Sequence, residues 1–155
     1  MEKPFSVAAA AICGFVVSFL VCSFDFWLIV AFAKDELAHR PASFHVWMDF
    51  SILILIFALC MTGMVTALAL DSLKDWARRI AVFPFPLSCG VLFLIVVLTF
   101  AVVSKPPPSD ALFVVGPGVD FAIFGFLLLP LLVVGIMWTA QFRRKAVRDL
   151  FLPPK

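Results

Sequence analysis

The sequence contains no tyrosine beside its 19 phenylalanines, and only 14% of its 155 residues are charged. The lack of tyrosine excludes phenol radicals and phenolic hydroxyl ligands. There are two histidines, His39 and His45, and neither lies clearly inside an apolar run, where the ligands of a b-type haem would stand. Glycine-rich phosphate loops, zinc protease motifs and nucleophile elbows are also absent. We therefore predict no catalytic residue, no cofactor and no metal centre, and favour a protein that is not an enzyme.

The four cysteines include no C-x-x-C pair, which disfavours a membrane thiol oxidoreductase. Cys13 and Cys22 would stand about 13 Å apart along one helix, too far for a disulfide. Cys13, Cys60 and Cys89 are expected at a similar depth, where they could form a thiol cluster. Buried cysteine acting as a small apolar side chain is the commoner situation, and we prefer it.

Long apolar runs dominate the sequence, and its mean hydropathy is +1.13. Four runs, at residues 5–30, 47–70, 80–103 and 121–138, each approach or exceed the ~20 residues that a helix needs to cross a bilayer. Lipid offers the backbone no hydrogen-bond partners, and uninterrupted rather than alternating apolar runs favour helices over a barrel. The predicted fold is an all-α, integral membrane four-helix transmembrane bundle, with residues 1–155 forming a single membrane domain that ends in a basic tail, 141–155.

The distribution of basic residues predicts the orientation. With both termini in the cytoplasm, that side holds nine of the twelve lysines and arginines, as the positive-inside rule requires. Trp27 and Trp47 would then mark the outer membrane boundary, and Trp76 and Trp138 the inner one, as an aromatic belt. We predict a multi-pass protein of a bacterial inner membrane or an equivalent membrane.

The first apolar run is long for a single span. Up to Ala33 it would form roughly 43 Å of helix against a hydrocarbon core of about 30 Å. It must therefore tilt, project outward or break near Asp25. The run is about twice the length of a signal-peptide core, so we expect no cleavage after Ala33.

Two basic segments are predicted to contact lipid headgroups on the inner side. The residues with this role are Arg78, Arg79, Arg143, Arg144 and Lys145. Residues 71–80 have the helical spacing of an interfacial helix. The tail from Gln141 mixes basic residues with Phe142, Val147, Leu150 and Phe151, which anionic lipids could hold. Ordinary positive-inside flanking explains both segments more simply than a lipid-sensing role.

Small residues predict where helices pack, because close backbone approach supplies much of the association in membranes. Gly14 and Ser18 belong to a stripe with four-residue spacing on the first helix, and Gly63 and Ala67 share a face of the second. These faces are expected to pair the first two helices, although Gly63-x-x-x-Ala67 could equally serve dimerisation. The outer connector is interrupted by prolines and by Gly116-Pro117-Gly118, which is typical of a turn. Its apolar residues 111–115 could dock on a partner protein.

Acidic residues near the outer ends define a candidate ion or proton site. Asp25 is the first candidate, because an ionisable residue inside an apolar run is costly and usually has a role. His45 and Asp49, at i and i+4, share a helix face, and His39 and Asp120 could join them. Imidazole and carboxylate suit divalent metals, but two histidines without a known motif do not define a metal site. A carboxylate satisfied by a neighbouring helix or by interfacial water is the simpler explanation of Asp25.

Two functions follow from these features. The first is an accessory, scaffold or assembly subunit that packs against a larger membrane protein, and the lack of a polar path through the bundle supports it. The alternative is a small oligomeric transporter or a cation- or proton-binding membrane protein with an outer-facing Asp/His site. The predicted partners are membrane lipids and either partner subunits or further copies of this chain. Nucleic acid is not a predicted partner, since topology explains the basic residues.

Overall fold

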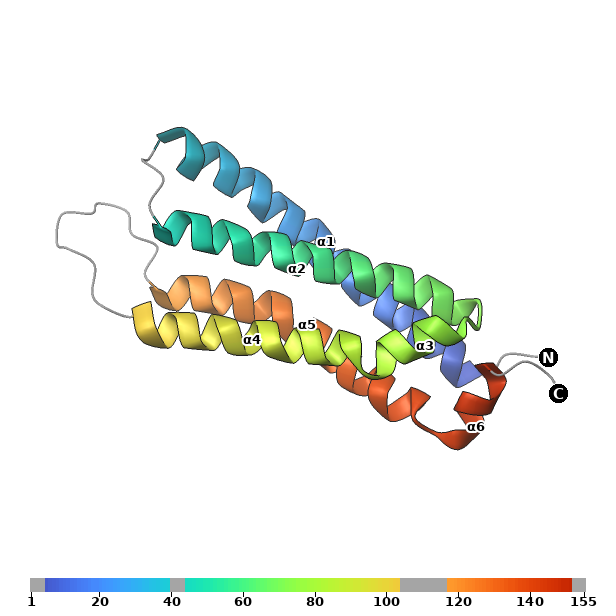
Figure 1. The fold of residues 1–155 in the computed structure, drawn as a ribbon. Helices are drawn as coiled ribbons and strands as arrows, with labels where there is room; N and C mark the ends of the chain where they lie inside the picture. Colours follow the sequence, from blue (N-terminus) through green and yellow to red (C-terminus); the bar gives the residue numbers. More distant parts are fainter. Residues whose placement is uncertain (1–4, 40–43, 104–116, 152–155) are drawn as a thin grey trace.

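The computed structural model describes residues 5–39, 44–103 and 117–151. Every element that it describes is helical. Four stretches are long and apolar enough to cross a membrane, Ser6–Lys34, Trp47–Asp71, Asp75–Thr99 and Ala122–Phe142. The helices run roughly side by side as an elongated bundle (Figure 1). The prediction of an all-helical membrane protein with four spans is confirmed.

The first two helices are longer than the apolar runs predict. Helix α1 covers Phe5–His39 and α2 covers Phe44–Asp71. Since α1 continues without interruption through Asp25, the predicted alternative of a break at that residue is wrong. The 35 residues of α1 correspond to roughly 52 Å of helix, so α1 exceeds the thickness of a hydrocarbon core.

The third predicted helix is divided in two. The short helix α3 covers Asp75–Val82 and α4 covers Pro84–Val103, with Phe83 between them. Pro84 begins α4 because its missing N–H costs nothing in the first turn. Before α3, the chain reverses at Leu73, whose φ is +54°, and the Lys74 amide donates to the Ala69 carbonyl at 3.0 Å. The predicted interfacial helix at 71–80 thus corresponds to α3.

Helix α5 covers Pro117–Phe142 and includes Pro130. The interpretation of Gly116-Pro117-Gly118 as a turn is therefore wrong for its last two residues, because proline's fixed φ also suits the start of a helix. After α5 come the short helix α6 (Lys145–Arg148) and the 3₁₀ helix η1 (Asp149–Phe151). The predicted connector residues 104–116, with the apolar segment 111–115, lie outside the described residues.

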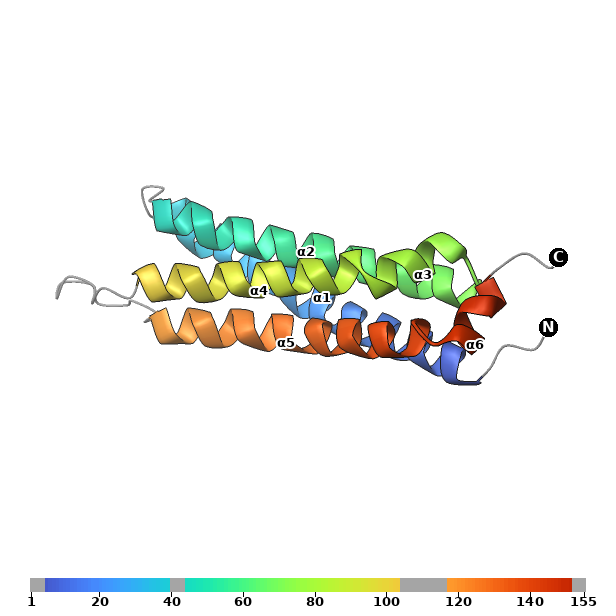
Figure 2. The same ribbon diagram turned by 60° about the horizontal axis from the view of Figure 1, so that its bottom comes forward.

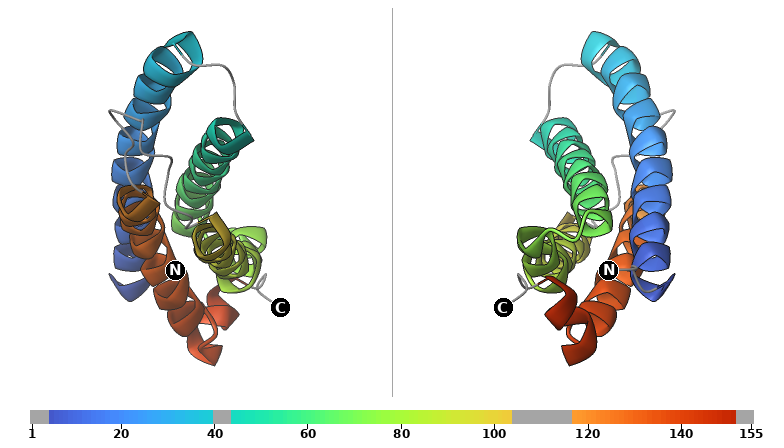
Figure 3. Two further views of the ribbon diagram at one scale, coloured as in Figure 1. Left: turned by 90° about the vertical axis from the view of Figure 1, so that its left-hand side faces the viewer. Right: turned by 90° about the vertical axis from the view of Figure 1, so that its right-hand side faces the viewer.

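The start of α1 lies at the same end of the bundle as α3 and α6 (Figures 1 and 2). We call this the terminal end, and the other, where α1 ends and α2 begins, the opposite end. Helix α1 crosses the bundle obliquely: it lies beside α5 near the terminal end and apart from it at the opposite end (Figure 3). The bundle is therefore more closely assembled at the terminal end.

Trp138 is the central side chain of the terminal end. It is fully buried, its indole N–H donates to the Ala10 carbonyl at 3.0 Å, and its ring lies 5.1 Å from that of Phe85. Its predicted place in an aromatic belt is wrong, because Gly14 leaves room for the indole inside the bundle: a Cβ there would overlap the ring. Trp27, Trp47 and Trp76 are exposed, as belt residues would be.

The C-terminal segment folds back on the bundle. Phe142, Val147 and Phe151 are buried, and the rings of Phe142 and Phe151 make an edge-on contact at 6.0 Å. The prediction that these apolar side chains enter the lipid interface is wrong for these three residues, because they pack against protein instead. Arg143, Arg144 and Lys145 remain exposed.

Candidate functional site

Asp25 is the most unusual side chain in the described part of the bundle. It is fully buried (0% exposed). Neither carboxylate oxygen has a hydrogen-bond partner among the residues that the structure describes. An unpaired buried polar group costs free energy that a protein normally avoids. Such a group is a reason to consider a function.

Other polar and sulfur-containing groups are buried in the same middle part of the bundle as Asp25. Ser18 and Cys22 are buried on the same helix, and the Ser18 hydroxyl also has no hydrogen-bond partner in the described structure. Cys60 of α2 is buried within electrostatic range of Cys22, Asp25 and Cys89. We call these five residues, Ser18, Cys22, Asp25, Cys60 and Cys89, the interior cluster. It joins α1, α2 and α4.

Small residues bring these helices together. A Cβ at Gly63 would stand 2.5 Å from the Ser18 hydroxyl oxygen and 3.1 Å from the ring of Phe85. Close backbone approach of this kind is the usual basis of helix packing in membranes. Gly63 and Ser18 therefore meet between α1 and α2, whereas Gly14 of the same predicted stripe faces Trp138 of α5. Ala67 is also buried.

The position of Asp25 along α1 is also informative. Beyond it, no residue up to Lys34 is fully buried: Leu28, Ile29, Phe32 and Ala33 are partly exposed, and Val30 is 36% exposed. Phe32 stacks on Phe50 of α2, with ring centroids 6.0 Å apart. Asp25 thus occupies the last close-packed layer of α1 before the opposite end.

Of the other acidic and histidine candidates, the structure describes only the side chain of Asp49. It is partly buried on α2 and has an interaction partner. The side chains of His39, His45 and Asp120 lie outside the described part of the chain. Within the described residues, no group of three or more histidine, cysteine, aspartate or glutamate side chains could hold a metal ion.

The cysteines divide differently from the prediction. All four are free, and Cys13 is exposed whereas Cys22, Cys60 and Cys89 are buried. The predicted cluster of Cys13, Cys60 and Cys89 is therefore wrong in one member, because Cys13 points away from the bundle. Cys22 takes its place. The sequence feature that could have indicated this is the position of Cys22 three residues before Asp25, on the same face of the helix.

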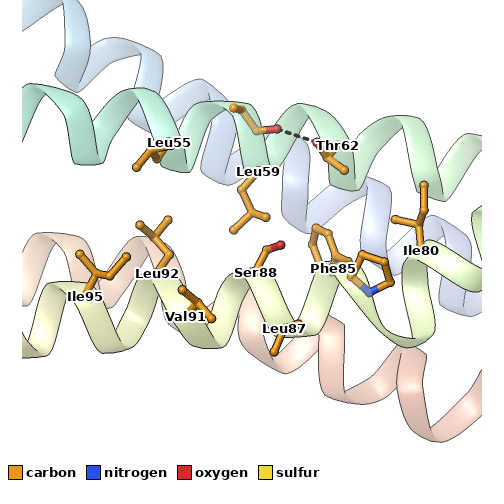
Figure 4. A pocket seen from close by; sticks show the side chains of 12 residues that line it. Leu55, Leu59, Thr62, Ile80, Phe85, Leu87, Ser88, Val91, Leu92 and Ile95 are labelled. Carbon is orange, nitrogen blue, oxygen red and sulfur yellow. Dashed lines mark hydrogen bonds between the residues drawn. The ribbon is translucent and has the colours of Figure 1, made fainter.

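A groove opens between α2, α3 and α4, with a volume of about 490 Å³. Leu55 and Leu59 of α2 face Ser88 and Leu92 of α4 across it, and Phe85 lies toward α3 (Figure 4). Its lining is almost entirely apolar, and the Thr62 hydroxyl in it donates to the Ala58 carbonyl at 2.9 Å. Sequence reasoning missed this groove, because it depends on how far α2 and α4 stand apart.

The basic residues predicted to contact lipid headgroups lie near the terminal end. Asp75 at the start of α3 accepts from Arg78 at 3.0 Å and pairs with Arg79 at 2.8 Å. Only 16% of the Arg78 side chain is exposed, against 75% for Arg79. Arg79, Arg143, Arg144 and Lys145 are thus the exposed members of the predicted headgroup set.

Fold and site together define a multi-pass, four-span helical membrane protein with a buried acidic residue and a lateral apolar groove. No protein-family model matches this sequence, and no curated protein or solved structure is significantly similar to it.

Proposed function

We propose that this protein is an accessory subunit that binds a larger membrane protein by accepting one of its transmembrane helices in the α2–α4 groove. The observation that carries the proposal is the groove itself. It follows two spanning helices, and from Pro84 to Ile95 it extends roughly 17 Å along α4. Its occupant would therefore lie within the membrane, alongside the bundle.

The lining of the groove favours a helix over an acyl chain. Ala58 and Thr62 are exposed at i and i+4 on α2, and Ser88 is exposed across from them on α4. Small residues at this spacing let another helix backbone approach closely, and hydroxyls can bond across the contact. An acyl chain gains nothing from either feature. The partner helix is expected to present its own small residues to this surface.

A block of the groove tests the proposal. Ser88→Trp fills it, while Val133→Trp adds the same side chain to a lipid-exposed position of α5 that is 57% exposed. In a mild detergent extract of the native membrane, native mass determination should show a larger complex. Ser88→Trp should release this protein from it, and Val133→Trp should not.

Three results would contradict the accessory function. A monodisperse monomer would remove the partner, a complex containing only this chain would make the occupant a second copy, and a mass increment of lipid size would make it a lipid. A photo-crosslinking side chain at Thr62 should attach to a peptide from a transmembrane helix of the partner.

For the orientation, we infer that both termini face the cytoplasm of a bacterial inner membrane or an equivalent membrane. The support is the basic set near the terminal end together with the positive-inside rule. Single cysteines introduced at Lys145 and at Lys34, in a chain whose own cysteines are replaced, should react differently with an impermeant thiol reagent in intact cells. Only the position near the opposite end should be labelled.

A second candidate function, a proton- or cation-binding membrane protein, is favoured by the unpaired carboxyl group of Asp25. This support is limited to Asp25, because the side chains of His39, His45 and Asp120 lie outside the described part of the chain.

A further inference from the structure

The interior cluster contains two polar groups that the bundle leaves unsatisfied. The Asp25 carboxylate oxygens and the Ser18 hydroxyl are buried, and none of them has a hydrogen-bond partner in the described structure. A carboxyl group kept there against its cost is a functional candidate.

The surroundings of Asp25 do not resemble a metal or alkali cation site. Cations such as calcium take six or more oxygen ligands, whereas Asp25 supplies two. The Ser18 hydroxyl is on the same face but seven residues away, roughly 10 Å along the helix. A proton, by contrast, needs only the carboxyl group itself. The chemistry of the site therefore selects a proton as ligand.

The charged and titratable groups around Asp25 are few. Cys22 of α1 and Cys60 of α2 lie within electrostatic range of it, and Cys89 of α4 lies within range of Cys60. The described side chains of α5, residues 122–142, include no acidic or basic group. Thus no cation among these neighbours stabilises an ionised Asp25.

Access to Asp25 is asymmetric. Toward the terminal end, the Gly63–Ser18–Phe85 and Gly14–Trp138 contacts leave no space for a methyl group without a shift of neighbouring atoms. Toward the opposite end, α1 has no fully buried residue from Phe26 to Lys34. A small separation of α1 and α2 at the Phe32–Phe50 contact would bring water to Asp25 from that side alone.

We propose that Asp25 is a proton-binding site inside the membrane bundle, which exchanges its proton with water at the opposite end along the incompletely buried end of α1. This inference deepens the second candidate function and does not depend on the groove or its partner. If Asp25 holds no proton, the accessory function is unaffected. If no partner complex is found, the infrared test of Asp25 is equally unaffected.

Infrared spectroscopy of the purified full chain in lipid nanodiscs tests the proposal. At neutral pH, the spectrum should contain the C=O band of a protonated carboxylic acid, and isotope-labelled aspartate should shift that band. Asp25→Asn should remove it, while Asp49→Asn, on α2, should keep it. Transfer into deuterated buffer should shift the band within the time of the experiment.

Two results would overturn the proposal. Absence of the aspartic acid band from the wild-type protein, or its survival in Asp25→Asn, would show that Asp25 holds no proton. A band that never shifts in deuterated buffer would show a sealed group with only a structural role. Because isotope labelling is read on the wild-type chain, the first test holds even where Asp25→Asn fails to fold. Phe32→Ala should speed the deuterium shift, and Phe83→Ala, at an exposed position near the terminal end, should not.

Discussion

The two ends of the bundle are built differently. At the terminal end, glycines admit the rings of Trp138 and Phe85, and α1 touches both α2 and α5. At the opposite end, α1 leaves α5 and its last described residues are only partly buried (Figure 3). Asp25 marks the border between the two. Close packing of α1 is thus confined to the terminal end, and segments with few buried contacts, like the other end of α1, are the ones that open most readily.

The largest expected effect comes from removing the central ring of the terminal end. Trp138→Ala should lower the free energy of unfolding by about 3–5 kcal/mol, because it leaves a cavity beside Phe85 and deprives the Ala10 carbonyl of a donor. Unfolding by a denaturing detergent in micelles measures this loss. Trp27→Ala, at a position 62% exposed toward the opposite end, is the matched control and should change stability little. Equal losses of unfolding free energy in Trp138→Ala and Trp27→Ala would show that the two ends of the bundle are packed equally closely.

The next effect tests the close approach of α1 and α2. Gly63→Val should cost about 1–3 kcal/mol, because the added methyl groups must displace the Ser18 hydroxyl and the ring of Phe85. Gly90→Val on α4 is the control, since a Cβ there meets nothing within 4 Å. The same detergent unfolding experiment compares the two variants. Similar stability of both would show that the helices can separate at Gly63 without loss.

A smaller effect is expected at the opposite end. Phe32→Ala removes a stacked but partly exposed ring, and aromatic pairs contribute about 0.5–1.5 kcal/mol beyond area burial. We expect the loss of unfolding free energy to lie at the low end of this range. Amide hydrogen exchange should meanwhile rise in residues 28–34 of α1 and not in residues 10–18. Exchange that rises throughout α1 would show that its two halves open as one unit.

The sequence predicts the spans well, because exposing polar groups to lipid is costly for each span by itself. Each span must therefore be apolar whatever helices pack against it. It places Asp25, Ser18 and Gly63 on interior faces by helical periodicity alone. It does not predict the location of Trp138, since a tryptophan near a boundary is as suitable for the interface as for a glycine-lined space on a helix 128 residues away in sequence. Nor does it predict that Cys22, rather than Cys13, is buried near Cys60, or that a groove opens between α2 and α4. Both features depend on the crossing angles that all the helices set together.

The smallest effect on stability is expected at Asp25, and its sign separates function from structure. Replacing a carboxyl group that stabilises the bundle lowers the free energy of unfolding. Replacing one that is retained for binding does not lower it. Neither oxygen of Asp25 has a hydrogen-bond partner in the described structure, so Asp25→Asn removes no observed interaction and exchanges the proposed neutral carboxylic acid for a neutral amide of similar size. We expect its free energy of unfolding to equal that of the wild type, measured under the same conditions as Gly63→Val. A loss as large as that of Gly63→Val would make Asp25 a structural residue and would move the search for a function to the groove.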